Sequence, residues 1–286
     1  MTTVAEVGSA RGVRLWRGLG WITWRQHRTA LLYAAAPLAL AAILMAATAS
    51  SLHRGELGPA LNDVVTSLLV LLLLLPVIAG VFLGAPLLAA EAERRTTQVV
   101  WTQTVSRVKW LTAQTVPIAA ALAAAGAALG LEYRWWIQPL EPNSWNSWLF
   151  ALHPLPLAGW LAFGFSLGVL LGGVIRRVVP AMAATAAGYV AVAFLAARWR
   201  RYYLPPLHRV LSLAAEYRAA FSFAGSRRPL EIISNRLLGG PLHAVLLTYQ
   251  PASRFGLFQL IEFGWLIALS AVLIGAAMFL IRRRPA

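Results

Sequence analysis

The run Gly164 to Gly168, which reads Gly-Phe-Ser-Leu-Gly, matches the G-x-S-x-G pattern of serine hydrolases. In those enzymes the serine sits at a strand–turn–helix junction beside a histidine and an acid. Ser166 lies inside a long apolar run instead, so we predict that it is not a nucleophile. The chain has no cysteine, and its histidines lack the spacing of metal ligands: His27, His53, His153, His208 and His243. The sequence therefore predicts neither a catalytic centre nor a metal site.

The only lysine, Lys109, lies between Val108 and Trp110. An ATP-binding P-loop has the sequence G-x-x-x-x-G-K-[ST], in which the lysine reaches the phosphates. The sequence around Lys109 does not fit this pattern, so we expect that the chain is not an enzyme and binds no cofactor. If ATP drives its work, ATP and Mg²⁺ are expected on a separate partner subunit.

Glu262 is the acid closest to the last apolar run of the sequence. An ionisable side chain at membrane depth is costly and frequently functional. Glu262 nevertheless lies within a turn of the start of that run. We therefore favour an acid at the membrane boundary, paired with Arg254 or with lipid headgroups, over a proton or substrate site.

The composition excludes an ordinary water-soluble protein. Hydrophobic residues make up 59% and charged residues 12% of the 286 residues, whereas soluble domains are about half apolar and a quarter charged. A helix needs ~20 mostly apolar residues to cross a bilayer. The sequence predicts an all-α integral membrane protein whose transmembrane domain, 30–286, has six spans: about 30–50, 64–90, 111–131, 156–175, 178–197 and 260–281.

Glycines recur every four residues in three of these spans: Gly80 and Gly84, Gly126 and Gly130, and Gly164, Gly168 and Gly172. Such spacing removes side chains from one face of a helix, so that a neighbouring helix can approach closely. We predict a helix-packing role for these glycines, with the lining of a substrate path as the alternative.

Arginines are distributed unevenly among the connecting segments. They concentrate before the first span, between spans two and three, between spans four and five, and in the C-terminal tail, whereas 51–63 and 132–155 carry only Arg54 and Arg134. Cytoplasmic loops are enriched in arginine and lysine. We therefore predict that both termini are cytoplasmic. The formal net charge of +15 is then explained by topology and membrane lipids rather than by nucleic acid.

This orientation leaves 198–258 as an external loop that carries nine arginines, an exception that the rule allows for loops of about this length. The loop also contains many apolar residues that are unfavourable in water: Leu211, Leu213, Ile232, Ile233, Leu237, Leu238, Leu246 and Leu247. We predict that it is partly helical and packed on the membrane surface.

The cytoplasmic N-terminus, 1–29, contains a stretch from Val13 to Arg28 that is too charged to span a membrane. On a helical wheel its arginines lie on one side and its apolar residues on the other: Arg14, Arg17, Arg25 and Arg28 against Leu15, Trp16, Leu19 and Ile22. This pattern predicts an amphipathic helix in the membrane interface. A basic flank without such a helix is the alternative.

The stretch from Gly84 to Leu111 resembles the loop after the second span in permeases of the type-2 ABC transporter family (ABC-2). Its acids, the later Thr-Val-Ser-Arg run and the return into span three occur in the family's order. The stretches Trp24 to Arg28, Arg176 to Met182 and Tyr249 to Phe255 resemble the actinobacterial branch. Thr96-Thr97 departs from the Gly-Thr that the family prefers, which implies a less tight turn.

The resemblance implies the permease subunit of an ATP-driven exporter in the plasma membrane of a bacterium. In that family a coupling helix after span two docks on the ATPase, and the N-terminal interface helix contributes. Carried over to the coupling loop 91–110, the ATPase contacts would be Glu91, Glu93, Thr97, Thr104, Val105, Ser106, Arg107 and Lys109. A second permease copy or a paralogue would complete a dimer, and the substrate is expected to be amphiphilic.

Two other functions remain as alternatives, an ion-coupled secondary transporter and a non-transporting membrane anchor or sensor. Secondary transporters usually show repeats and ionisable residues at the membrane midplane. The sequence shows no clear inverted repeat and no midplane charge, which favours the permease.

Overall fold

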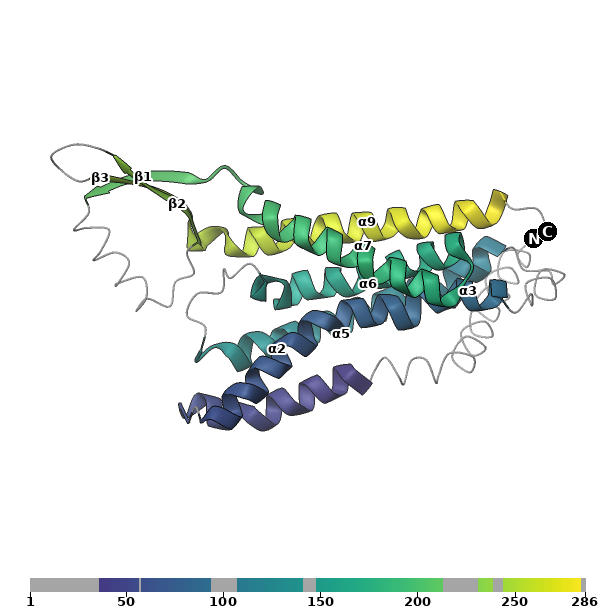
Figure 1. Ribbon diagram of the computed structural model, residues 1–286, viewed down its shortest axis with the longest axis horizontal. Coiled ribbons are helices and arrows are strands. Elements are labelled where there is room, and N and C mark those ends of the chain that lie inside the picture. The colour runs from purple at the N-terminus through teal and green to yellow at the C-terminus, as the bar shows by residue number, and fades with distance from the viewer. Residues whose placement is uncertain are drawn as a thin grey trace, which may run out of the picture.

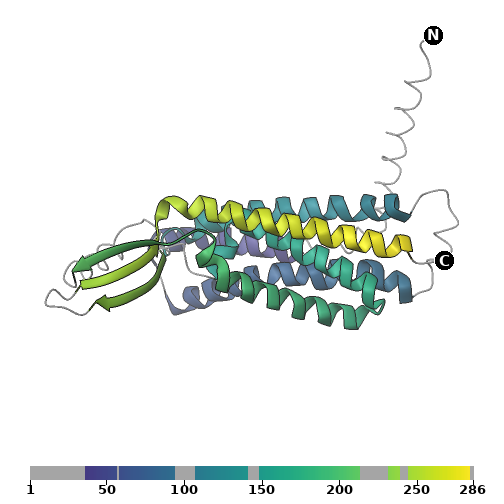
Figure 2. The same ribbon diagram turned by 90° about the horizontal axis from the view of Figure 1, so that it is seen from above.

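A computed structural model of the chain describes residues 36–56, 58–93, 107–140, 148–212, 231–238 and 244–283. The helices form one elongated bundle, and a small sheet projects from one end of it (Figures 1 and 2). Among the described residues, six helical segments are long and apolar enough to cross a membrane: Ala36–His53, Pro59–Glu93, Val108–Ile137, Pro154–Ile175, Val178–Tyr202 and Phe255–Arg283. The predicted class, a mostly helical protein with six spans, is confirmed.

The elements that follow the helix Ala36–His53 are α2 (Pro59–Ala79), η1 (Gly80–Gly84), α3 (Ala85–Glu93), α5 (Arg107–Ile137), η2 (Leu149–Leu152), α6 (Pro154–Ile175), α7 (Val178–Trp199), η3 (Arg200–Tyr202), β1 (Leu207–Ser212), β2 (Glu231–Leu238), β3 (Ala244–Gln250), η4 (Ala252–Arg254) and α9 (Phe255–Arg283). The element η1 is a π-helical turn, and η2, η3 and η4 are 3₁₀ turns.

Helix α6 lies at the centre of the bundle, in contact with α2, α3, α5, α7 and α9. A helix that is apolar on every side is one that is buried, and all residues of α6 from Pro156 to Ser166 are buried. Ser166, the serine of the hydrolase-like motif, donates its hydroxyl hydrogen bond to the carbonyl oxygen of Ala162 at 2.7 Å. It is therefore a buried residue of a helix and has no strand–turn–helix junction around it.

The chain reverses direction between α6 and α7 within two residues. Arg176 caps α6 in the left-handed conformation, with φ of 60°, and its N–H bonds to the carbonyl oxygen of Gly172. Arg177 is extended, and α7 begins at Val178. The apolar stretch that contains both helices thus forms two antiparallel spans.

The second span is a continuous helix interrupted by a wider turn. Pro76, inside α2, has no N–H with which to bond the carbonyl oxygen four residues earlier. In η1 the N–H of Ala85 bonds to the carbonyl oxygen of Gly80, five residues back, which makes this turn π-helical. Turns of this kind are rare and frequently occur at functional places in helices.

Helix α6 meets this span backbone to backbone. Each of three α6 glycines lies against a carbonyl oxygen of the second span, where an added Cβ would collide: Gly164 against Pro76, Gly168 against Gly80, and Gly172 against Ala85. An added Cβ at Gly84 would in turn collide with the carbonyl oxygen of Phe165. We call this contact the glycine seam. It leaves no room for a side chain between the two helices.

The other glycine pair, on α5, also approaches α6. A Cβ at Gly126 would lie 2.9 Å from the carbonyl oxygen of Leu157, and one at Gly130 would lie 2.5 Å from the Cα of Pro154. Helix α6 is therefore flanked by close backbone contacts from two spans.

The segment 198–258 differs from the prediction. Its strands form an antiparallel sheet in the order β1-β3-β2, with Leu207 opposite Tyr249 in one pair and Glu231 opposite Gln250 in the other. The sheet extends beyond the end of the bundle (Figure 2). For the described residues between 207 and 250 the helical part of the prediction is wrong, because these residues form paired strands, which favour branched and aromatic residues.

The glycine seam predicts that Gly168→Ala lowers the stability of the protein. The new methyl group has no space against the Gly80 carbonyl oxygen, and overpacking of this kind typically costs about 1–3 kcal/mol. The matched control is Gly264→Ala in α9, where an added Cβ meets nothing within 4 Å and alanine favours the helix by up to about 1 kcal/mol. Thermal unfolding in detergent should show a lower midpoint for Gly168→Ala only. Equal midpoints for both variants would contradict the seam.

Candidate functional site

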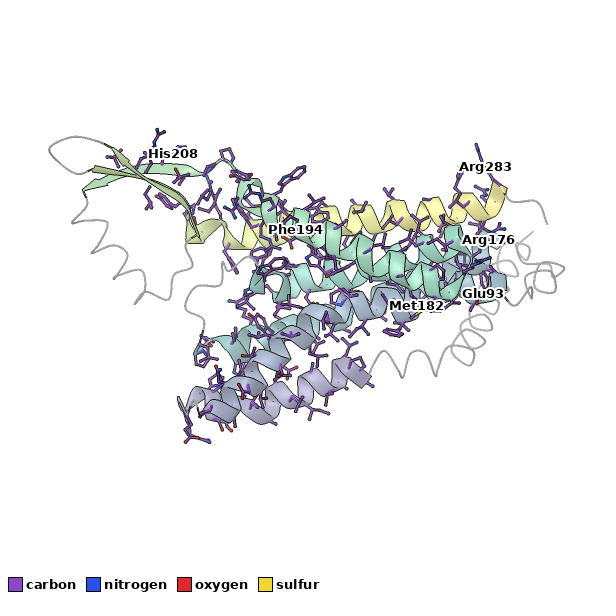
Figure 3. The ribbon with its side chains drawn as sticks, in the orientation of Figure 1. Glu93, Arg176, Met182, Phe194, His208 and Arg283 are labelled. Atoms are coloured by element: carbon purple, nitrogen blue, oxygen red, sulfur yellow. The ribbon has the colours of Figure 1, made fainter. Side chains whose placement is uncertain are left out.

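The last residue of α3 is hydrogen-bonded to the first residue of α7. Glu93 Oε1 accepts a hydrogen bond of 2.9 Å from the backbone N–H of Val178. The first N–H groups of a helix have no partner within the helix, and Arg177 supplies no side-chain cap to α7. Glu93 therefore satisfies one of these groups and places a negative charge at the positive end of the helix dipole. Figure 3 shows Glu93 and Arg176 at the same end of the bundle.

Small residues pack α3 against α7 beside that hydrogen bond. Ala85, Ala89 and Ala181 are fully buried together, and Ile175 and Met182 pack against them. With the glycine seam, this contact makes α3, α6 and α7 one packed unit. Residues 94–106 connect α3 to α5 in the sequence. A displacement of this connection in the direction of α3 would therefore act on both α6 and α7.

The structure describes three of the eight predicted ATPase contacts with their side chains. Glu91 is half-buried near the end of α3, Glu93 is exposed, and Lys109 is exposed in the first turn of α5. The remaining predicted residues lie outside the described part of the chain. These are Thr97, Thr104, Val105, Ser106 and Arg107 in the coupling loop, and Arg14, Arg17, Arg25 and Arg28 in the predicted interface helix. Arg107 is a partial exception, because its backbone is described and its side chain is not.

A second cluster of polar groups surrounds Glu262, at the end of the bundle near the sheet. Its carboxylate is fully buried and binds Arg200, whose side chain is 4% exposed, through two hydrogen bonds: Nε to Oε2 at 2.6 Å and Nη2 to Oε1 at 2.8 Å. Such a bidentate pair is strong and directional. Trp160 Nε1 donates to Oε1 at 2.8 Å, and the Tyr203 hydroxyl donates to Oε2 at 3.3 Å. The carboxylate thus has four donors.

This buried cluster joins elements that are distant in the sequence. Glu262 belongs to α9, Trp160 to α6 and Arg200 to η3, and the Arg200 guanidinium lies 4.5 Å from the centre of the Phe150 ring in η2. A cation over an aromatic face is stabilised further by the ring. The cluster therefore fixes α6, η3 and α9 at the point where the chain leaves the bundle for the sheet.

The partner predicted for Glu262 is wrong. Arg254 donates instead to the carbonyl oxygen of Pro205 at 2.7 Å and to Gln250 Oε1 at 3.0 Å. Gln250 in turn donates to the carbonyl oxygens of Leu204 and Arg201, at 2.8 and 3.2 Å. Arg254 and Gln250 therefore hold the base of the sheet, while the buried Arg200 neutralises Glu262.

Sequence reasoning missed Arg200 because the pair is 62 residues apart and no periodic pattern connects α7 with α9. A weaker signal was present in the sequence. Three of the four residues from Arg198 to Arg201 are arginines at the end of a span, and a buried acid in a neighbouring span needs a cation of this kind.

The buried pair predicts a large loss of stability when either charge is removed and a less than additive loss when both are removed. Glu262→Gln or Arg200→Met should each lower the free energy of unfolding by about 3–5 kcal/mol, because each leaves one buried charge unpaired. The double variant Arg200→Met/Glu262→Gln should lose less than the sum of the two. Arg54→Gln, which breaks the exposed pair with Glu56, is the control and should unfold like the wild type. Additive losses in a double-mutant cycle, measured by unfolding in detergent, would contradict the coupling.

Comparison with known proteins agrees with this architecture. A family model described as ABC-2 membrane transporter related matches residues 18–201, more than half of the chain. No curated protein and no solved structure matches the chain. The matched range includes the glycine seam, the contact between Glu93 and Val178, and the arginines at the end of α7. The chain belongs to the ABC-2 membrane transporter related family and is a multi-pass transporter permease.

Proposed function

We propose that this chain is the membrane-spanning permease subunit of an ATP-driven exporter, in the plasma membrane of a bacterium. A separate ATPase subunit would bind ATP and Mg²⁺, and a second permease copy or a paralogue would complete the transport path within membrane lipids. Membership of the ABC-2 membrane transporter related family supports this proposal. The lack of a P-loop sequence around the only lysine, Lys109, supports the assignment of ATP hydrolysis to another subunit.

The observation that carries the proposal is the packed unit formed by α3, α6 and α7. A permease driven by an external ATPase must transmit a displacement from the ATPase contact to the helices that surround the substrate. The connection 94–106 leads directly out of α3, which is bound to α6 through the glycine seam and to α7 through Glu93. Docking of the ATPase on the coupling loop 91–110 would therefore move α6 and α7 together.

The positions of the charges support a cytoplasmic location for the end of the bundle at which α3 ends and α7 begins. Glu93, Arg176 and Arg283 lie at one end, and His208 on the sheet lies at the other (Figure 3). Arg176, Arg177, Arg282 and Arg283 are all exposed, and cytoplasmic segments are enriched in arginine. In this orientation the sheet is external, and the amphiphilic substrate leaves the cell toward the side of the sheet.

The first test concerns the ATPase contact itself. Arg107→Glu and Val105→Asp should each weaken ATPase binding by about 2 kcal/mol or more, about 30-fold, if these residues are central to the contact. Arg54→Glu, in the connection on the opposite side of the membrane, should have no effect. The measurement is recovery of the ATPase with the tagged chain from its native membranes, identified by mass spectrometry. Undiminished recovery in both variants would place the contact elsewhere, and a wild-type chain that recovers no ATPase would favour an ion-coupled transporter.

The second test concerns transmission from α3 to α7. Val178→Pro removes the N–H that donates a hydrogen bond to Glu93. The helix should be preserved, because proline is favoured at the first helical position and Arg177 before it is already extended. We expect the ATPase to remain bound while the ATP hydrolysis rate of the complex falls. The control Val178→Ala, which keeps the N–H, should hydrolyse ATP at the wild-type rate. Equal rates for the two variants would show that the hydrogen bond transmits nothing.

A further inference from the structure

A groove of about 310 Å³ lies between α7 and α9, on the side of the bundle near the sheet. Its lining is apolar and aromatic: Val192, Leu195, Ala196, Trp199, Tyr203 and Trp265. This volume is at the lower end of the ~300–1,000 Å³ that is usual for small-molecule sites. Leu195 and Trp199 are 50% and 67% exposed, so the groove opens to the surroundings of the bundle.

The polar atoms of Trp265 and Tyr203, in the groove wall, are turned to internal partners. Trp265 Nε1 donates to the Tyr203 hydroxyl at 3.0 Å, and that hydroxyl donates to Glu262. The two rings therefore offer hydrocarbon and aromatic surface to an occupant. Most of the lining belongs to the membrane spans Val178–Tyr202 and Phe255–Arg283. The groove therefore faces lipid when the chain is in a membrane.

Two arginines lie in the same stretch of chain as the groove-lining residues Leu195, Trp199 and Tyr203. Arg198 follows Leu195 by three residues and Arg201 follows Arg198 by three, a spacing that places successive side chains on one side of a helix. Arg198 is exposed and Arg201 is half-buried. Arg201 Nε is buried and has no hydrogen-bond partner among the described residues. Within the described part of the chain, no carboxylate forms a salt bridge with either arginine.

The neighbouring acid does not neutralise this charge. Glu262 is already fully engaged by Arg200, whose guanidinium spans both carboxylate oxygens. Among the described residues, the positive charges of Arg198 and Arg201 therefore have no acidic partner. Trp199 and Tyr202, both more than half exposed, lie beside them, and such aromatic residues are typical of the level of lipid headgroups.

We propose that this groove is a binding site for an anionic phospholipid. One acyl chain lies in the groove between α7 and α9, and Arg198 and Arg201 bind the phosphate of the headgroup. The apolar lining favours a hydrocarbon chain, and the two cations select an anionic headgroup over a zwitterionic one. The site requires only that the chain is embedded in a membrane and is independent of ATPase binding.

Competition between two lipids tests the selectivity. The purified, delipidated protein is incubated with equal amounts of phosphatidylglycerol and phosphatidylcholine, and the lipid that remains bound is measured by native mass spectrometry. The wild type should retain phosphatidylglycerol in preference. Arg198→Gln/Arg201→Gln should lower this retention by about fivefold per arginine, which corresponds to about 1 kcal/mol each. The control Arg236→Gln/Arg282→Gln removes two exposed charges elsewhere and should retain lipid like the wild type.

A second pair of variants tests the groove. Val192→Phe fills it and should lower phosphatidylglycerol retention, whereas Val190→Phe places the same ring on the exposed face of α7 outside the groove and should not. Equal retention of the two lipids by the wild type, or unchanged retention in both the arginine and the Val192→Phe variants, would overturn the proposal. If Val192→Phe abolishes self-association and leaves lipid retention unchanged, the groove is a subunit interface and the proposal is likewise wrong.

Discussion

The close approach of α6 to the second span is the constraint on which the rest of the bundle depends. Lipid tails are as apolar as leucine, so helices in a membrane gain little from hydrophobic burial and associate through close packing. Gly164, Gly168 and Gly172 provide that packing by bringing backbone onto backbone. Because α6 also contacts α5, α7 and α9, its position against the second span determines where each of these helices lies.

The two ends of α7 are held by different kinds of interaction. At its first residue, the backbone N–H of Val178 is bound by Glu93 at an exposed position. Directly after its last residue, Arg200 forms the buried pair with Glu262. A buried pair of charges contributes little net stability over an apolar substitute, but its bidentate hydrogen bonds fix the geometry between Arg200 and Glu262. The end near the sheet is therefore held by a buried ion pair, while the other end is held by the packing of small residues around Ala181 and by one exposed hydrogen bond.

Sequence reasoning was most successful where a single helix carries its own signal. The length of the apolar runs predicts six spans, and the two arginines at Arg176 and Arg177 predict a reversal of the chain. It failed where structure depends on distant partners. The strands around Leu207 and Tyr249 pair across some forty residues, and the apolar content of that segment suggested contact with the membrane instead. The true partner of Glu262 was equally hidden, because Arg254 is close in sequence and Arg200 is close only in the fold.

The two-residue connection between α6 and α7 has a consequence for the insertion of the protein into the membrane. Arg176 and Arg177 are the whole link, and an arginine at the bilayer centre costs about 2.5–3.5 kcal/mol on insertion scales. Passage of the turn through the bilayer would therefore be costly, so once both helices are inserted, neither can invert without the other. Helix α6, whose glycines leave part of its surface bare, is thereby tied to α7, whose exposed Val179, Val190 and Phe194 suit contact with lipid.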